Sequence, residues 1–305
     1  MLAAQEIAWL ILTPLIFLGW TAFIGRRYSR DFSMSERLMA SFVCGISQIV
    51  GTTIILGSFN ILYWWPLFII NASIAAFWLI LSLHHDGTMN LLVKLGKSMC
   101  VFGDVFKSSI AICIIGLMAL LISAWVIYLG QLLPSVGYDS WGYHYLWAAL
   151  CRQTGNIGYD NLSDPMISVY PWNTDILFLW WIIGAQAERW SNIAQAPFAL
   201  AAALACYRMA RNAGVRRADA AIAGLFVFSV PTVIHQMWVA YVDLAVMGAT
   251  LISCAFLSRK RLTPAALAIA GASAFYAHAL LAARTTHLSS ADAISRRLRG
   301  RPKHH

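Results

Sequence analysis

The chain has 305 residues, of which 60% are hydrophobic and only 11% are charged, and its formal net charge is +9. A soluble domain usually has about a quarter of its residues charged, and one water-soluble core could not hide this much apolar surface. Apolar runs of about 20 residues flanked by charges are what a bilayer core requires. The composition therefore predicts an all-α, polytopic transmembrane bundle and argues against a soluble enzyme.

Three further features are not expected: a nucleic-acid partner, a framework of disulfides or zinc, and a cleaved signal peptide. The basic residues lie in short clusters between apolar runs, so they indicate helix orientation and not a nucleic-acid partner. The six cysteines form no C-x-x-C pair and lie mostly inside apolar runs, which disfavours a disulfide framework or a zinc site. The first apolar run lacks a basic leader and a small-residue cleavage site, so an uncleaved span is expected there.

The apolar runs predict about eight spans. They cover residues 8–24, 38–59, 66–83, 110–129, 194–210, 220–235, 244–257 and 264–283. Between the fourth and fifth lies a segment of about sixty residues, 130–193, whose one further apolar run, 176–183, is too short to cross. That run predicts an interfacial or re-entrant helix in a large external loop. The chain is thus divided into 1–129 (four spans), 130–193, 194–283 (about four spans) and a basic tail, 284–305, that is expected to be disordered.

The basic residues of the loops predict the orientation, because cytoplasmic loops are enriched in Lys and Arg. Every second loop is basic, while residues 130–193 carry only Arg152 and Arg189. The basic loops contain Arg26, Arg27, Arg30 and Arg37, then Lys94, Lys97 and Lys107, then Arg208, Arg211, Arg216 and Arg217, and finally Arg259, Lys260 and Arg261. We therefore expect a multi-pass protein of the plasma (bacterial inner) membrane, with its N-terminus and the 130–193 loop outside.

The tail breaks this alternation. It should lie outside after an eighth span, yet it carries six basic residues, which include Arg296, Arg297 and Arg299. Either the last segment does not cross fully, or the tail comes from a premature end or a shifted reading frame.

The candidate chemistry begins with Asp139 in the sequence Tyr138-Asp139-Ser140-Trp141-Gly142-Tyr143-His144, close to the end of the fourth span. If a helix starts here, Tyr143 and His144 lie near the side of the helix that carries the carboxylate. An acid, an imidazole and aromatic rings at a membrane surface could activate a hydroxyl or hold a sugar or phosphate group. The same residues also fit an N-capping aspartate with a belt of interfacial aromatics.

Two other places carry acids. Asp164, Tyr170-Pro171 and Asp175 follow in the same loop, where Asp175 fits a helix N-terminal charge as well as a ligand. Asp243 opens the seventh span after almost no loop, and an acid at the membrane face is a functional candidate by default. Its alternative is a helix cap. Asp139 and Asp243 are expected to emerge on the same side. No acid pair has specific metal-ligand spacing, although a divalent metal remains an open alternative.

Four short motifs in order resemble the GT-C membrane glycosyltransferases, in particular the group similar to dolichyl-phosphate-mannose-protein mannosyltransferases and bacterial lipopolysaccharide-core glycosyltransferases. The resemblance covers roughly residues 132–257. The motifs are Tyr138-Asp139-Ser140-x-x-Tyr143-His144, Tyr170-Pro171, Arg208-x-x-Arg211 and Tyr241-Val242-Asp243-Leu244.

The resemblance implies transfer of a sugar from a polyprenyl-phosphate donor to a lipid, glycan or protein acceptor outside the cytoplasm. It implies Asp139, His144 and Asp243 as catalytic residues, and Tyr138, Tyr143, Asp164, Tyr170 and Tyr241 as substrate contacts. Members usually have more spans than this chain. A truncated, inactive member therefore remains an alternative, as does a transporter or lipid-binding membrane protein, although no internal repeat is visible.

Overall fold

The computed structural model describes residues 4–84, 110–135, 137–157 and 173–276, and these residues form helices joined by turns. The long apolar elements are α1 (Ala4–Arg27), α2 (Met34–Ser58), a helix over Trp64–His84, α4 (Ile110–Leu132) and α9 (Ala196–Asn212). The shorter elements are η1 (Ser140–His144), α5 (Tyr145–Thr154), α7 (Asp175–Gly184), α8 (Glu188–Asn192), α10 (Arg217–Leu225), η2 (Phe226–Ser229), α11 (Pro231–Gln236), α12 (Asp243–Leu257) and a helix over Pro264–Tyr276.

Five helices in the described part of the chain are long and apolar enough to cross a membrane. Four of them are the spans expected within residues 1–129, and the fifth is α9 extended backwards by α8, over Glu188–Asn212. The expected helical class is confirmed, and these helices are consistent with a membrane protein. The figure of eight spans stays a prediction, because α12 and the helix over Pro264–Tyr276 are shorter and the latter's expected end lies outside the described residues.

The expected span over residues 220–235 is broken into three pieces. α10 gives way to the 3₁₀ turn η2, and α11 starts afresh at Pro231 after the extended residue Val230. Proline has no backbone N–H to continue the helical hydrogen bonds, and it disfavours helical geometry in the residue before it. Hydropathy alone did not reveal this break.

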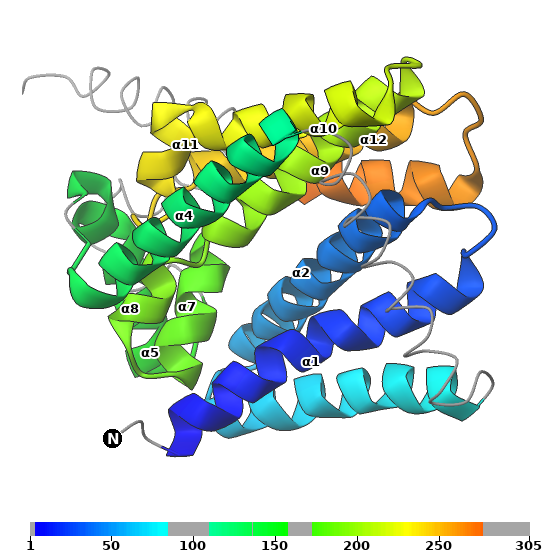
Figure 1. Ribbon diagram of the computed structural model, residues 1–305. Helices are drawn as coiled ribbons and strands as arrows, with labels where there is room; N and C mark the ends of the chain where they lie inside the picture. The colour runs from blue at the N-terminus through cyan, green and yellow to red at the C-terminus, as the bar shows by residue number, and fades with distance from the viewer. Residues whose placement is uncertain (1–3, 85–109, 136, 158–172, 277–305) are drawn as a thin grey trace, which may run out of the picture.

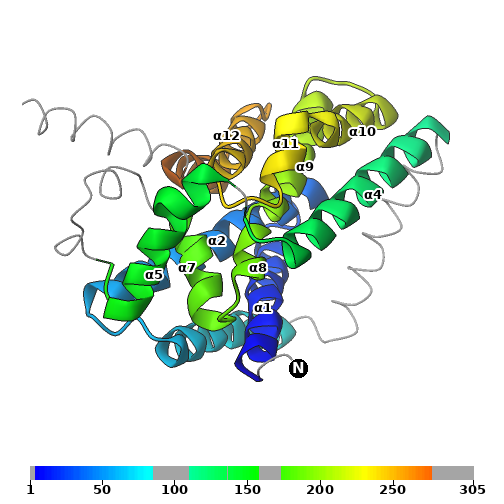
Figure 2. The same cartoon turned by 90° about the vertical axis from the view of Figure 1, so that its left-hand side faces the viewer.

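The helix α4 shows why a water-soluble fold does not fit. Only four of its residues are buried, while apolar side chains such as Leu120 and Trp125 are more than half exposed. A continuous exposed apolar surface of this kind is costly in water and normal against lipid. Figures 1 and 2 show α4 at the edge of the bundle, beside α10 and α11.

Polar side chains inside the bundle are paired between helices. Gln48 of α2 donates to Asn71 Oδ1 (2.9 Å) and accepts from Trp20 Nε1 of α1 (2.9 Å), and Asn71 in turn donates to Thr52 Oγ1 (3.0 Å). Buried hydrogen bonds of this type tie neighbouring helices together where the hydrophobic effect does not. They fix α1, α2 and the Trp64–His84 helix as one unit.

The two ends of the bundle differ in chemistry. At one end, here named the site end, Glu6 near the start of α1 accepts from Arg189 and Trp190 of α8. At the other, the basic end, Glu36 at the start of α2 pairs with Arg208 of α9 and Arg259 beyond α12. Figure 1 shows the start of α1 on the side of α5, α7 and α8, with the α1–α2 and α9–α10 turns at the opposite end. Three of the predicted basic loops therefore gather at one end, whereas the remaining one, with Lys94, Lys97 and Lys107, lies outside the described residues.

The predicted non-spanning helix is α7, which is only ten residues long and is packed inside the protein. Figure 2 shows it between α5 and α8. Trp180 of α7 packs on Trp9 of α1 with ring centroids 4.5 Å apart, and both indoles are fully buried. α7 is thus an interior helix and does not lie on the surface.

Replacing Gly184 with alanine is expected to destabilise the protein, because the added Cβ would fall well inside van der Waals contact with the Trp9 ring. Overpacking of this kind typically costs about 1–3 kcal/mol. Thermal unfolding in detergent measures it. Gly51→Ala in α2 is the matched control, because nothing lies within 4 Å of its added Cβ. Equal melting temperatures for the two variants would contradict the packing.

Candidate functional site

The first part of the candidate site is the segment that follows α4 and leads into η1. Ser140 is buried, accepts from Ser135 Oγ (2.7 Å) and donates to the backbone oxygen of Ala240 (3.2 Å). η1 is a one-turn π-helix, a geometry that is rare and frequent at functional sites. The serine thereby ties the segment that carries Asp139 to the turn between α11 and α12.

Gly137 makes this approach possible. A Cβ at this position would lie 2.5 Å from Tyr241 Cε1 and 2.8 Å from Val239 Cγ1, so only glycine lets the two segments pack this closely. Gly137, two residues before Asp139, thus packs against the turn that leads to Asp243.

Asp139 stands at the start of η1 but does not cap it. Its backbone is helical, and its side chain makes no capping hydrogen bond. The capping alternative raised by the sequence therefore does not account for this carboxylate, whose residue is half-buried.

The start of α12 repeats this arrangement. Two glutamines that the sequence did not single out bind its first N–H groups: Gln236 Oε1 accepts from Leu244 N (2.8 Å) and Gln195 Oε1 from Ala245 N (3.1 Å). Asp243 makes no capping bond and instead accepts from Gln236 Nε2 (2.8 Å). Because glutamines from two other elements accept hydrogen bonds from the first N–H groups of α12, the carboxylate of Asp243 is not needed to cap this helix. No pattern in the chain predicts this, since Gln195 is 48 residues away.

Both acids affect the pKa of Tyr241. Burial raises the pKa of its phenol above the ordinary value, and the negative charges of Asp139 and Asp243 raise it further. The two carboxylates are thus within electrostatic range of one hydroxyl. Tyr241 remains protonated at neutral pH, and its O–H is available as a hydrogen-bond donor.

His144 is placed differently from the sequence interpretation, which put it beside Asp139. Its Nδ1 lies 2.5 Å from Asp175 Oδ1, and both side chains are only 2% exposed. The π-helical turn and the buried helix α7 bring these residues together, so the imidazole holds the start of α7 against η1. Tyr143 and Phe178 pack on its ring. In this geometry the His144 imidazole links η1 to α7, and its predicted catalytic role stays a prediction.

The remaining predicted contacts are scattered. Tyr138 is 86% exposed, and Tyr143 is half-buried. Asp164 and Tyr170 lie outside the described residues, so their predicted roles stay predictions. Within the described ranges, no group of three His, Cys, Asp or Glu side chains could hold a metal ion.

Loss of the His144–Asp175 contact is expected to destabilise the fold. His144→Ala leaves the buried carboxylate of Asp175 without its partner, which lowers the free energy of unfolding by about 2 kcal/mol. His235→Ala is the control, because it removes only an exposed ring. A double-mutant cycle with Asp175→Ala, followed by thermal unfolding, measures the coupling. Strictly additive effects of the two substitutions would rule out the interaction.

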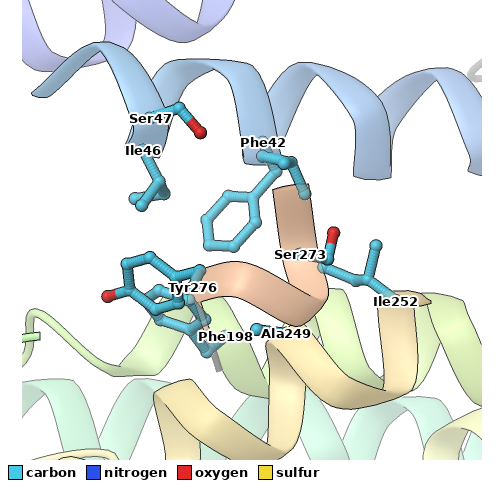
Figure 3. Close-up of a pocket in the computed structure, with 9 residues that line it drawn as sticks. Phe42, Ile46, Ser47, Phe198, Ala249, Ile252, Ser273 and Tyr276 are labelled. Atoms are coloured by element: carbon cyan, nitrogen blue, oxygen red, sulfur yellow. The ribbon is translucent and has the colours of Figure 1, made fainter. Parts of the chain in front are cut away.

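A partly open pocket lies elsewhere in the bundle, between α2, α9, α12 and the Pro264–Tyr276 helix. It has an empty volume of about 250 Å³. Figure 3 shows Phe42 facing Phe198 and Tyr276 across it. The described residues of its wall include no carboxylate or imidazole, so it does not offer acid–base chemistry.

Fold and site together define a helical protein with helices of membrane-spanning character. At the end opposite the basic loops, two acids that do not serve as helix caps lie near one tyrosine. Comparison with known protein families, curated proteins and solved structures gives no match for this chain.

Proposed function

We propose that the chain is a membrane glycosyltransferase that moves a sugar from a polyprenyl-phosphate donor to an acceptor on the non-cytoplasmic side. The supporting observation is that the segment of Asp139 packs at Gly137 against Tyr241, two residues before Asp243, while glutamines cap the adjacent helix. The resemblance of the Tyr138-to-His144 and Tyr241-to-Leu244 motifs to GT-C enzymes gives this pair its proposed chemistry.

In the proposed reaction, Asp139 takes the proton of an acceptor hydroxyl as that oxygen bonds to the anomeric carbon. The bond between this carbon and the phosphate oxygen breaks, and polyprenyl phosphate leaves with the electron pair, so the anomeric configuration inverts. The protonated phenol of Tyr241 donates a hydrogen bond to substrate oxygen. Asp243, held by Gln236, contributes a second carboxylate to the proposed site.

The position of the acids favours this function over transport. A transporter would carry its ionisable groups near the bilayer midplane, along a path between helices. Here the segments that carry Asp139 and Asp243 pack against each other at the site end through Gly137 and Tyr241. Mass spectrometry of cell-envelope glycans tests the proposal: deletion of the gene should remove one sugar, and the intact gene should restore it. An unchanged glycan profile would refute the assignment.

The proposed orientation has its own test. In a cysteine-free background, Tyr138→Cys should react with a membrane-impermeant maleimide on intact cells, because this exposed position belongs to the site end. Arg261→Cys, at an exposed position of a basic loop, should react only after permeabilisation. The reverse pattern would place the site in the cytoplasm.

A further inference from the structure

A second feature of the site end is a groove between α5 and the turn from α7 to α8. Its empty volume is about 720 Å³, and its walls include Trp141, Tyr145, Leu146, Arg152, Gln186 and Glu188. None of these residues was a candidate in the sequence. The groove begins at Trp141, two residues beyond Asp139.

Trp141 provides a fixed aromatic surface in this groove. Its Nε1 donates to the backbone oxygen of Ser135 (2.7 Å), and its ring meets Tyr145 edge to face at 5.5 Å. The side chain is nevertheless 55% exposed. Because its N–H is satisfied and its orientation is held, the ring offers a flat apolar face to a ligand.

The polar residues of the groove offer both donors and acceptors. Arg152 brings N–H groups, Glu188 brings a carboxylate anchored by Ser135 N (3.2 Å), and Gln186 brings an amide. The backbone of Gln186 is held in the left-handed region, with φ +53°, and its side chain donates to Gln5 (3.1 Å). Such a set suits vicinal hydroxyl groups. A phosphate would be repelled by Glu188, and a lipid tail would leave these groups unpaired.

We propose that this groove binds a hexopyranose ring, stacked on Trp141 and hydrogen-bonded by Arg152, Gln186 and Glu188. Resting on the proposed function, the ring belongs to the acceptor, which is then a glycan and not a simple lipid. Asp139 directly precedes η1 and Trp141 lies within it, so the proposed base and the proposed stacking residue belong to one short segment.

Saturation-transfer NMR on the full chain in nanodiscs tests the binding step without any transfer. The probes are methyl α-D-mannopyranoside, methyl β-D-glucopyranoside and methyl β-D-galactopyranoside. At least one should receive saturation from the wild-type protein. Trp141→Ala should weaken that binding about tenfold, as expected for loss of one aromatic contact. Trp141→Phe should retain most of the binding, and Glu188→Gln should reduce it.

The control is Trp125→Ala, which removes a similarly exposed indole from α4, and it should leave the signal unchanged. Unfolding temperatures confirm that each variant is folded. The proposal is overturned if no glycoside receives saturation, if Trp125→Ala reduces the signal as much as Trp141→Ala, or if glucose 1-phosphate binds more tightly than every glycoside. Asp139→Asn should keep sugar binding. If that variant also kept transfer, Asp139 would not be the base, and if deletion of the gene left the envelope glycan unchanged, the proposed function would fail while the groove assignment stood.

Discussion

Asp139→Asn is expected to abolish sugar transfer while the protein still inserts and folds. Asparagine keeps the size of the side chain but cannot accept the proton of the acceptor hydroxyl, and loss of a general base lowers a rate by about 10²–10⁴-fold. Asp139 makes no capping bond in η1, so its replacement should not disturb the helix start. The envelope glycan of a deletion strain that carries the variant gene provides the measurement.

Two further substitutions make this result specific. Asp31→Asn changes an exposed acid near the basic end and should leave transfer unchanged. Asp243→Asn should reduce transfer less than Asp139→Asn, because an amide can still hydrogen bond to the side chain of Gln236. Normal glycan from the Asp139 variant would remove this residue from the proposed mechanism, whatever the outcome at Asp243.

Glu36→Gln is expected to give the largest loss of stability. Glu36 is 1% exposed and lies 3.1 Å from Arg208 Nε and 3.4 Å from Arg259 Nε, while its other oxygen accepts from Ser33 N (2.7 Å). The amide can preserve the bond to Ser33 but not the two charge pairs. Removal of one partner from a buried pair typically costs about 3–5 kcal/mol, and the lower value applies here because Arg208 is 24% exposed.

Thermal unfolding in nanodiscs measures this loss, and Asp219→Asn is the matched control. Asp219 pairs with Arg216 on the surface of the basic end, so its replacement should not change the melting temperature measurably. Replacement of Glu36, Arg208 and Arg259 together by methionine should recover most of the loss, since no buried charge is then left unpaired. If the triple variant were less stable than Glu36→Gln, the charge argument would be wrong.

Much of the architecture follows from local sequence. The first four apolar runs and the fifth, which forms α9, are long and apolar. In a bilayer their backbones must satisfy their own hydrogen bonds, so their helical state is predictable within a few residues. The short run at residues 176–183 is likewise helical, as α7, and too short to cross. The basic loops that the structure describes lie together, as their alternation predicts.

The site depends on contacts that no local pattern encodes. The sequence identified Asp139 and Asp243 and expected them on one side, but not that Gln195 and Gln236 would cap α12 in place of Asp243. It placed His144 beside Asp139, whereas the π-helical turn and the depth of α7 pair it with Asp175. It did not locate the groove at Trp141, whose walls come from η1, α5, α7 and α8.

By itself, then, the sequence determined the helical class and the acids near the helix ends, because hydropathy and helix-terminus chemistry act within a few residues. Only the tertiary structure decided which carboxylates form buried pairs with a histidine or an arginine and which do not. The reason is that the partners of a buried polar group are set by packing between helices. Residues such as Glu36 and Arg208, which are 172 positions apart, meet only when the bundle closes.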